Sequence, residues 1–353
     1  MKILHLAASN RWTGAAAPAF AEVEALRAAG VDAHYAYVGG YRLEQRIGRH
    51  DFAHHLIEKN QNPMTFRRSV EAIYRMIKRH GFDFVHAHLT YDHWLARFAA
   101  REHNVMLART FHSGRTLRQD PFTKSLVRRT SVLCLINDTF RNAELVRDLS
   151  PVFTPPPLDQ RQFTPDGPNA RQSYGISAET PLFAVIGKMS PDRGFEEAVQ
   201  TFAEIRKRLP AARLMIIGRG PHRSAIEELA RTLDVSESVF FAGYHETDLA
   251  EHYRAANALL FTVTGSDEGH RAVIEAMGCG VPPASFPIEG LEALYGHLSP
   301  RLIAASPHPE ALAERTLSIL SDRSLADEVI ARASAFNYES AANRLIAAYS
   351  NAM

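Results

Sequence analysis

Short apolar runs that alternate with helical segments constrain the fold of this chain more than any other feature. The apolar run 3–8 leads through a turn with Gly14 into a helical pattern over 15–29, which Gly30 ends, and 33–38 is the next apolar run. Short runs without strict polar alternation, separated by helices, are typical of parallel strands buried on both faces. Three further runs follow in the first half, at 84–88, 105–111 and 132–136. This half is therefore predicted to be a parallel α/β domain.

The pattern changes in the proline-rich segment 150–168, which contains Thr154-Pro155-Pro156-Pro157 and Thr164-Pro165-Asp166-Gly167-Pro168. Proline continues neither a helix interior nor a central strand, so we place an interdomain linker here. The alternation then restarts, with strands predicted at 182–187, 213–218, 239–243 and 258–262 and helices at 195–209, 223–233 and 247–256. The sequence thus predicts two doubly wound α/β domains, 1–160 and 161–335, facing each other across a cleft.

The composition is that of a soluble globular protein, with 46% hydrophobic and 22% charged residues in a chain of 353. Its two cysteines form neither a zinc pattern nor a disulfide framework, and Cys134 lies in an apolar run that predicts burial. The first apolar run is too short for a signal peptide, and nowhere do ~18 apolar residues follow one another. We therefore expect a protein of the reducing cytoplasm.

Charged residues are distributed unevenly between the two halves. Residues 1–160 contain 22 Lys and Arg against 15 Asp and Glu, a net charge of +7, and residues 161–353 contain 18 against 24, a net charge of −6. Two explanations stay open: the two surfaces are simply solvated, or the basic half contacts an anionic partner, such as lipid at the inner face of the membrane or a phosphorylated molecule. No nucleic-acid partner is expected. Basic residues gather in the segment 115–129 and at Arg67, Arg68, Arg75, Lys78 and Arg79.

A phosphate site is predicted where the segment 267–282 follows the strand at 258–262, because ligands of doubly wound sheets bind beyond the carboxyl ends of the strands. We expect a helix that begins near His270 and ends at Gly278 or Gly280. Backbone N–H groups at a helix N-terminus lack intrahelical partners and suit an anion. Here they belong to Gly269, His270, Arg271 and Ala272. Gly269 also has no side chain that would keep a diphosphate away.

Charged side chains flank this predicted anion site. Asp267 precedes the helix and Glu275 follows two turns later; carboxylates accept hydroxyl protons, so the pair suits a polyhydroxylated ligand. Lys188 and Arg193 fall in the loop after the strand at 182–187, where two cations could neutralise a leaving diphosphate. Structural explanations stay open as well, with Asp267 as a helix cap, Glu275 as a surface residue and the two cations as solvated charges.

Together these segments resemble motifs of the family 4 (group 1) glycosyltransferases. The stretch from Gly187-Lys188 to Arg193-Gly194 is similar to that family's Gly-Arg-Leu-x-x-x-Lys-Gly segment with the two cations exchanged, and Asp267 to Glu275 has the spacing of its Glu-x7-Glu motif. Weaker similarities follow the family's order, at Pro156–Phe163, Gly218-Arg219-Gly220-Pro221, Phe240–Tyr244 and, in the first half, Trp12–Ala15 and Thr110–Ser113. The resemblance covers nearly all of the second half and, more weakly, the first.

The resemblance implies a GT-B fold whose last helix, within 336–353, crosses back onto the first domain. It also implies a nucleotide-sugar donor, held mainly by the second domain, and retention of the anomeric configuration. By position, Lys188 and Arg193 would bind the donor diphosphate. Asp267 would contact the transferred sugar, and Glu275 would bind the nucleotide ribose. The remaining donor-side candidates are Gly14, Gly218, Tyr244, Gly269, His270, Arg271 and Ala272.

Histidines provide the candidates in the first half. His112 is the main one, because the family's corresponding histidine contacts the donor sugar or the acceptor near the reacting centre. His86 and His88 share one face of a predicted strand, and His88, nearer the strand's end, is a candidate on the acceptor side. No metal site is expected from these histidines. The predicted catalytic set consists of His112, Lys188, Arg193 and Asp267.

No Asp-x-Asp pair occurs in the sequence, so we expect a metal-independent reaction without a cofactor, in which the leaving phosphate oxygen takes the acceptor proton. The acceptor, whether a glycan, a lipid-linked or a small molecule, is not identified; a role in cell-envelope polysaccharide or glycolipid synthesis is expected. Two alternatives stay open: a catalytically silent nucleotide-sugar binding module, and a GT-B nucleotide-sugar 2-epimerase. An oxidoreductase is disfavoured, because no Gly-x-Gly-x-x-Gly follows the first strand.

Overall fold

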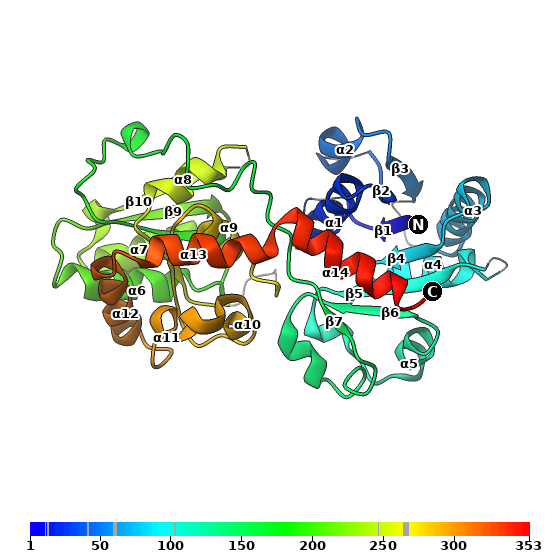
Figure 1. The fold of residues 1–353 in the computed structure, drawn as a ribbon. Helices are drawn as coiled ribbons and strands as arrows, with labels where there is room; N and C mark the ends of the chain where they lie inside the picture. The colour runs from blue at the N-terminus through cyan, green and yellow to red at the C-terminus, as the bar shows by residue number, and fades with distance from the viewer. Residues whose placement is uncertain are drawn as a thin grey trace. The chain divides into compact units, whose positions relative to one another are not determined.

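The computed structural model describes residues 1–10, 12, 14–40, 42–58, 62–101, 104–245, 247–263 and 268–353. They form two compact units. Unit 1 consists of the described residues of 1–157 and 337–353 together with Glu268 and Gly269, and unit 2 consists of those of 158–265 and 270–336. Figure 1 shows that each unit is a sheet with helices on its faces. The chain first leaves unit 1 between Pro157 and Leu158, inside the proline-rich segment.

Unit 1 is built on parallel strands, which in its described part are β1 (Lys2–Ala7), β2 (Asp32–Val38), β3 (Ala53–Ile57), β4 (Phe84–Ala87), β5 (Met106–Phe111), β6 (Val132–Leu135) and β7 (Val152–Phe153). Their order in the sheet is β3-β2-β1-β4-β5-β6-β7. The register sets His5 of β1 beside His86 of β4. Every residue of β4 and β6 is buried, because helices cover both faces of the sheet.

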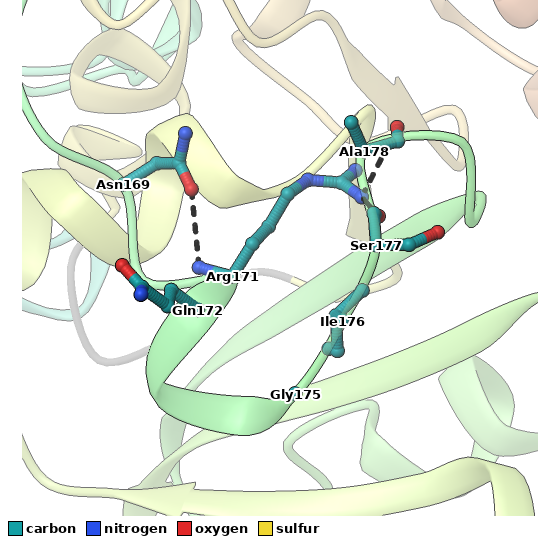
Figure 2. A pocket seen from close by; sticks show the side chains of 7 residues that line it. All are labelled: Asn169, Arg171, Gln172, Gly175, Ile176, Ser177 and Ala178. Atoms are coloured by element: carbon teal, nitrogen blue, oxygen red, sulfur yellow. Dashed lines mark hydrogen bonds between the residues drawn. The ribbon is translucent and has the colours of Figure 1, made fainter.

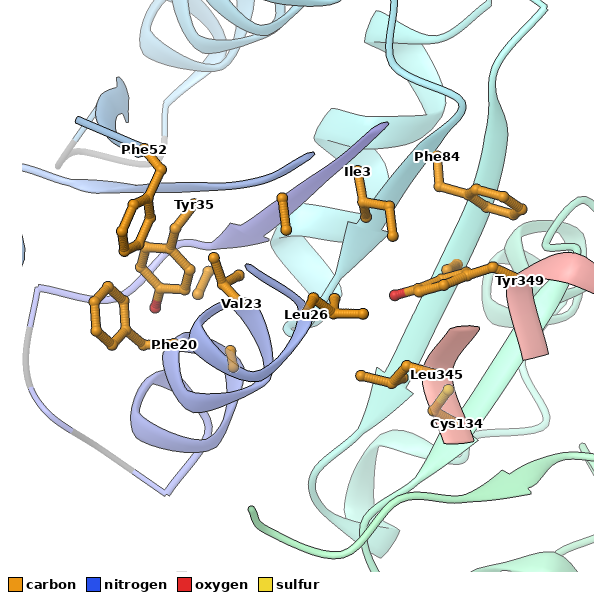
Figure 3. Packing of buried hydrophobic residues seen from close by; sticks show 14 of the residues in the cluster. Ile3, Phe20, Val23, Leu26, Tyr35, Phe52, Phe84, Cys134, Leu345 and Tyr349 are labelled. Atoms are coloured by element: carbon orange, nitrogen blue, oxygen red, sulfur yellow. The ribbon is translucent and has the colours of Figure 1, made fainter. Parts of the chain in front are cut away.

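Two layers of helices enclose this sheet. The helices are α1 (Ala16–Ala28), α2 (Arg42–Ile47), α3 (Pro63–His80), α4 (Thr90–Ala99), α5 (Pro121–Val127) and α14 (Tyr338–Ser350), with 3-10 turns η1 (Gly114–Thr116) and η2 (Asp138–Asn142). Helices α1 and α14 pack together, and Leu26 of α1 and Tyr349 of α14 meet Phe84 of β4 in one core (Figure 3). Helices α3 and α4 bury Ile73 and Leu95 in a second core.

Several helix ends follow local sequence signals. The side chain of Asn62 accepts hydrogen bonds from two backbone N–H groups in the first turn of α3, and Gly81 ends that helix in the left-handed region at φ 63°. Asp120 caps α5 in the same way. Gly30, expected to end the first helix, has φ 82°, a conformation that glycine adopts without strain.

Unit 2 has a smaller sheet, whose described strands are β8 (Leu182–Lys188), β9 (Arg213–Arg219), β10 (Val239–Gly243), β11 (Ala258–Phe261) and β12 (Pro283–Ser285). They pair in the order β10-β9-β8-β11-β12, and all pairings are parallel. Its helices are α6 (Phe195–Arg206), α7 (Arg223–Thr232), α8 (Leu249–Ala255), α9 (Arg271–Gly278), α10 (Leu291–Tyr295), α11 (Ser299–Leu302), α12 (Pro309–Ser321) and α13 (Leu325–Ala333). Its 3-10 turns are η3 (Gln172–Tyr174), η4 (Ser236–Ser238), η5 (Gly296–Leu298) and η6 (Ser334–Phe336).

The predicted architecture of two doubly wound α/β units is confirmed. Helix α6 buries the predicted apolar face with Phe195, Val199 and Phe202, but it ends at Arg206 instead of 209. Pro210 follows shortly after, and a proline disfavours the helical conformation of the residue that precedes it, here Leu209. The last helix, α14, belongs to unit 1, where the Tyr338 hydroxyl donates to Glu24 of α1.

The structure also bears on two expectations from the sequence, the burial of Cys134 and the lack of a membrane-spanning segment. Cys134 is buried as expected, and Cys279 is buried too. Among the helices of the described residues, none combines the length and the apolar character that crossing a bilayer requires.

Candidate functional site

The donor-side candidates of unit 2 lie at or beyond the carboxyl ends of β10, β9, β8 and β11, which are neighbours in the sheet. At the ends of β8 and β9 the register sets Gly187 beside Gly218. A Cβ atom on Gly218 would lie 1.8 Å from the Gly187 carbonyl oxygen, and Gly218 has φ 133°. Only glycine fits there, so the predicted Gly218 is explained by the close approach of two strand ends.

Lys188 is the last residue of β8, and Arg193 lies in the loop that leads from β8 to α6. The Lys188 side chain is exposed and Arg193 is half-buried. Among the residues that the structure describes, neither cation forms an ion pair with a carboxylate. Both cations are therefore available to bind an anionic ligand.

The loop that holds Arg193 is fixed to the end of β11. Gly194, at φ 74°, ends the loop, and its carbonyl oxygen accepts a hydrogen bond from the Thr262 hydroxyl at 2.6 Å. A Cβ atom on Gly194 would lie 2.2 Å from that hydroxyl oxygen. The loop after β8 is therefore held against the strand that precedes the predicted anion site.

Helix α9 begins where the sequence predicted a phosphate site. His270 precedes it in the left-handed region at φ 54°, and its Nε2 donates to the Glu289 carbonyl oxygen at 2.9 Å. The Val273 N–H donates to the His270 carbonyl oxygen at 3.0 Å, which closes the first turn. Arg271 and Ala272 are the first two residues of this helix.

Glu275 is buried within unit 2, at 8% exposed, and its carboxylate has partners in the protein. Oε2 accepts a hydrogen bond from the Tyr253 hydroxyl at 3.1 Å, and Oε1 lies 3.5 Å from Nε of Arg271 on the same helix. Burial raises the pKa of the Tyr253 hydroxyl well above its usual range, so this hydroxyl stays a donor. Glu275 is therefore held in one orientation rather than being a solvated surface residue.

Tyr244 follows β10 and is half-exposed. The Arg219 guanidinium lies over its ring, 4.5 Å from the ring centroid. Arg219 is the last residue of β9, so a cation and an aromatic face meet at neighbouring strand ends. This pairing was not predicted, because the sequence separates the two residues by a helix and a strand.

Gly269 of the predicted anion site belongs to unit 1, and so does Glu268 before it. A Cβ atom on Gly269 would lie 2.6 Å from a side-chain carbon of Ile136, so packing within unit 1 explains this glycine. The Glu268 carboxylate accepts hydrogen bonds from the Ser113 hydroxyl, at 2.5 Å, and from the Gly114 N–H, at 3.0 Å. Glu268 was not predicted as a site residue, and no local signal in the sequence marks its partners. Asp267 lies outside the described residues.

In unit 1 the histidine candidates meet in the core. His112 follows β5 and His88 follows β4; Nε2 of His112 lies 2.9 Å from Nδ1 of His88. Nε2 of His88 lies 2.9 Å from Nδ1 of His5, in β1. His112 is 8% exposed, whereas His88 and His5 have no exposed surface. His88 was predicted as a candidate on the acceptor side; in this structure both of its ring nitrogens bond to other histidines. Gly14 lies in the turn before α1.

Burial keeps these histidines neutral. It lowers the pKa of His5 and of His112 to about 3, and that of His88 well below its usual value, because the charged imidazolium would lose its hydration. The Glu22 side chain of α1 is buried, and this burial raises the pKa of its carboxyl group to about 8. At neutral pH the cluster therefore consists of uncharged groups.

Two groups of side chains in the described part of the chain each bring at least three possible metal-ligand atoms within 4.8 Å of one another. The first group is His5, Glu22, His86 and His88, and the second is His245, Asp248 and His252. Glu22 was not predicted to join the histidines, because it lies on α1 and they lie on or just after strands. In the second group, Nδ1 of His245 lies 2.8 Å from Asp248 Oδ2, and the ring centroids of His245 and His252 are 3.6 Å apart.

A surface pocket of about 460 Å³ in unit 2 involves none of the predicted site residues. It lies along the segment from Asn169 to Ala178 (Figure 2). Its cation, Arg171, donates to the carbonyl oxygens of Ser177, at 2.6 Å, and Thr180, at 2.9 Å, and to the Asn257 side chain, at 2.8 Å. Arg171 therefore stabilises the loop before β8 and is not available to a ligand.

Comparisons with known proteins give matches over both halves of the chain. A family model described as glycosyl transferases group 1 matches residues 166–336, and one described as Glycosyltransferase Family 4 matches residues 12–140. The chain is 24% identical over 277 residues to the N-acetyl-alpha-D-glucosaminyl L-malate synthase of Bacillus anthracis, an alignment that covers 74% of this chain and 71% of that protein.

Further relatives match over shorter stretches. The chain is 32% identical over 139 residues to the GDP-mannose-dependent alpha-(1-6)-phosphatidylinositol monomannoside mannosyltransferase of Mycolicibacterium smegmatis, which is 36% of each chain. Among solved structures, Anabaena HepE in complex with UDP superposes with a TM-score of 0.82 at 17% identity, covering 99% of this chain and 100% of that one. At this identity the likeness shows the shared fold.

Proposed function

Because this chain belongs to the family 4, group 1 glycosyltransferases and has their GT-B fold, we propose that it transfers a sugar from a nucleotide-sugar donor with retention of configuration and without a metal ion. The observation that supports this proposal is the pair Lys188 and Arg193 at the carboxyl end of β8. Neither cation has a carboxylate partner in the described part of the chain. Two such cations beside the start of a helix suit a diphosphate.

In the proposed reaction these groups act on the leaving nucleotide diphosphate. Negative charge grows on its oxygens as the bond to the sugar breaks, and Lys188, Arg193 and the first N–H groups of α9 stabilise that charge. A leaving phosphate oxygen takes the proton of the attacking acceptor hydroxyl, which then bonds to the anomeric carbon from the same face. Glu275, fixed by Tyr253, would bind the nucleotide ribose. Asp267 keeps its proposed contact with the transferred sugar.

We propose an anionic acceptor that binds unit 1. The segment 1–160, nearly all of which belongs to unit 1, has a net charge of +7. The names of the two relatives above include L-malate and phosphatidylinositol, both of which are anionic at neutral pH. An excess of positive charge raises the local concentration of such a molecule and its rate of association.

We also propose that unit 1 contacts an anionic membrane surface. Helices α3, α4 and α5 expose Met64, Phe98 and Phe122, which are 65%, 41% and 70% exposed. The Trp94 ring joins the two phenylalanines, with ring centroids 6.1 Å from Phe98 and 6.5 Å from Phe122. Helix α3 lies beside this aromatic cluster, because the ring centroids of its Phe66 and of Phe98 are 5.6 Å apart, and α3 also carries exposed basic residues. Aromatic side chains beside Lys and Arg suit the boundary between lipid headgroups and acyl chains. The basic residues are Arg67, Arg68, Arg75, Lys78 and Arg79.

The test of the proposed function is donor binding by single variants. Arg193→Ala and Lys188→Ala are expected to weaken the affinity for a nucleotide sugar by about 10–100-fold each, since a hydrogen bond to a charged group contributes roughly 1.5–3 kcal/mol. Calorimetry with a panel of nucleotide sugars would measure this. Lys207→Ala is the matched control, because Lys207 pairs with Glu204 next to α6. Wild-type affinity and turnover in Arg193→Ala would contradict the proposed diphosphate role.

The same panel separates the remaining alternatives. A catalytically silent binding module would bind a donor with the same dependence on Arg193 but would neither transfer nor hydrolyse it. A 2-epimerase would convert the donor without any acceptor. Transfer that requires an added hydroxyl compound distinguishes the proposed function from both.

A further inference from the structure

Three histidines form a continuous row of hydrogen bonds in unit 1. They come from three neighbouring strands or strand ends, with His112 after β5, His88 after β4 and His5 within β1. Both contacts, His112 Nε2 to His88 Nδ1 and His88 Nε2 to His5 Nδ1, are 2.9 Å long. The row runs from a strand's carboxyl end, where ligands of such sheets bind, into the core.

Each contact needs one N–H group and one lone pair. Because burial lowers the pKa of all three imidazoles far below neutrality, each ring has a single N–H. The position of the proton on one ring therefore fixes its position on the next. Only two arrangements satisfy both contacts. In one, every N–H is on Nδ1, and in the other, every N–H is on Nε2.

The two arrangements differ at the ends of the row. With the protons on Nδ1, His112 presents an N–H at its outer end and His5 keeps a lone pair in the core. With the protons on Nε2, His5 has an N–H in the core. In the described part of the chain, neither Nδ1 of His112 nor Nε2 of His5 has a hydrogen-bond partner. Both of these nitrogens are buried, but the His112 residue keeps 8% of its surface exposed at the strand's carboxyl end, whereas His5 has none. A buried N–H without an acceptor costs more than a buried lone pair, so we expect the unpaired N–H at the His112 end, where a bound ligand can supply the acceptor.

We propose that His88 and His5 are positioning residues that hold His112 as one neutral tautomer, with its proton on Nδ1, so that His112 donates a hydrogen bond to an oxygen of the bound sugar or acceptor. The identity of that ligand rests on the proposed function; the tautomer does not. A fixed tautomer and ring orientation is the contribution that a supporting hydrogen bond makes to a functional histidine.

The alternative occupant of this cluster is a metal ion, held by His5, Glu22, His86 and His88. The hydrogen bonds argue against it. His86 bonds through Nδ1 to the Tyr349 hydroxyl, at 2.5 Å, and through Nε2 to the Thr110 hydroxyl, at 2.8 Å. His88 likewise uses both ring nitrogens. A metal ion would have to break a contact at both residues.

The tautomer can be read from the nitrogen chemical shifts of the full-length protein with ¹⁵N-labelled histidine, and His112→Gln assigns the signals. In the wild type we expect the Nδ1–H form of His112 to exceed the other by about tenfold or more. In His5→Leu the row loses its inner end, and the two forms should approach equal population. His5→Gln should restore the wild-type ratio, because its amide N–H can donate to His88. His93→Gln is the matched control, since His93 is buried but bonds to Thr130 instead.

Three outcomes would overturn the proposal: a wild-type His112 with its proton on Nε2 or with mixed tautomers, an unchanged ratio in His5→Leu, or stoichiometric metal in the purified protein that Glu22→Gln removes. The wild-type measurement needs no variant, so it decides even if His5→Leu does not fold. If the tautomers behave as expected but no sugar is transferred or bound, the proposed function fails and the positioning role stands.

Discussion

At the scale of single residues, the ends of β8 and β9 depend on the absence of a side chain. Gly218→Ala would place a methyl group against the Gly187 carbonyl oxygen at a φ that L-residues rarely adopt. We expect the free energy of unfolding to fall by more than about 2 kcal/mol, and donor affinity to fall with it, because Lys188 follows Gly187. Urea denaturation followed by circular dichroism would measure the first effect.

Gly175→Ala is the control for this substitution. Gly175 also has a positive φ, of 62°, but a Cβ atom there would have no neighbour within 4 Å. The cost should be limited to the backbone conformation, about 1–2 kcal/mol. Equal losses in the two variants would show that the close approach of the strands contributes nothing.

How far individual residues could be predicted depends on whether their partners are local in sequence. Arg193 lies in the loop after β8, as the strand-turn-helix pattern predicts, whereas Lys188 is still part of the strand, as its last residue. The partners of Glu275 and His88 do not follow from any local pattern: Tyr253 reaches Glu275 from α8, and His5 reaches His88 from β1. A role on the acceptor side was therefore assigned to a histidine that the fold buries.

At the scale of elements, the long strands and helices were predictable because burial on two faces produces continuous apolar runs. Strands β3, β7 and β12 were not predicted. The last two contain only two and three residues, too few for a pattern, and β3 contains His54 and His55 in place of apolar side chains. Helices α10 to α13 were not assigned either, although the last helix was.

Helix α14 offers a test of how the elements of unit 1 depend on one another. Tyr349→Phe removes the hydroxyl that bonds to Nδ1 of His86 and leaves that nitrogen buried without a partner. We expect the free energy of unfolding to fall by about 1–3 kcal/mol. Thermal and urea denaturation would measure the change.

Tyr338→Phe is the matched control on the same helix. It removes a hydroxyl that donates to Glu24 at 3.0 Å, in a partly solvated place, so the expected loss is about 1 kcal/mol or less. If Tyr338→Phe destabilised the protein as much as Tyr349→Phe, the buried contact with His86 would have no special importance.

At the scale of the whole molecule, the uneven distribution of charge predicts that the protein binds an anionic surface through unit 1. We expect it to bind vesicles that contain phosphatidylglycerol but not vesicles of phosphatidylcholine alone, and to dissociate at about 1 M salt, where the Debye length is about 3 Å. Co-sedimentation with the vesicles would measure this. Binding that is insensitive to salt, or absent at low salt, would contradict an electrostatic contact.

Variants assign such binding to a surface. Arg75→Glu on α3 and Phe122→Ala on α5 should each weaken it several-fold, since one basic residue near an anionic surface contributes about 1 kcal/mol. Arg231→Glu on α7 is the control, because Arg231 is an exposed cation of unit 2. The net charge was visible in the sequence, but the aromatic cluster was not, because Trp94 and Phe122 come from different helices.

All of unit 2 lies in sequence between the first and last parts of unit 1, and Tyr349, in the last part, belongs to the core of unit 1. During synthesis, unit 2 has all of its residues once Phe336 has left the ribosome, whereas unit 1 still lacks the helix that covers β4. Unit 1 therefore cannot complete its core until α14 has been made, after all of unit 2. Nascent chains halted before α14 would present an open, apolar sheet surface to chaperones.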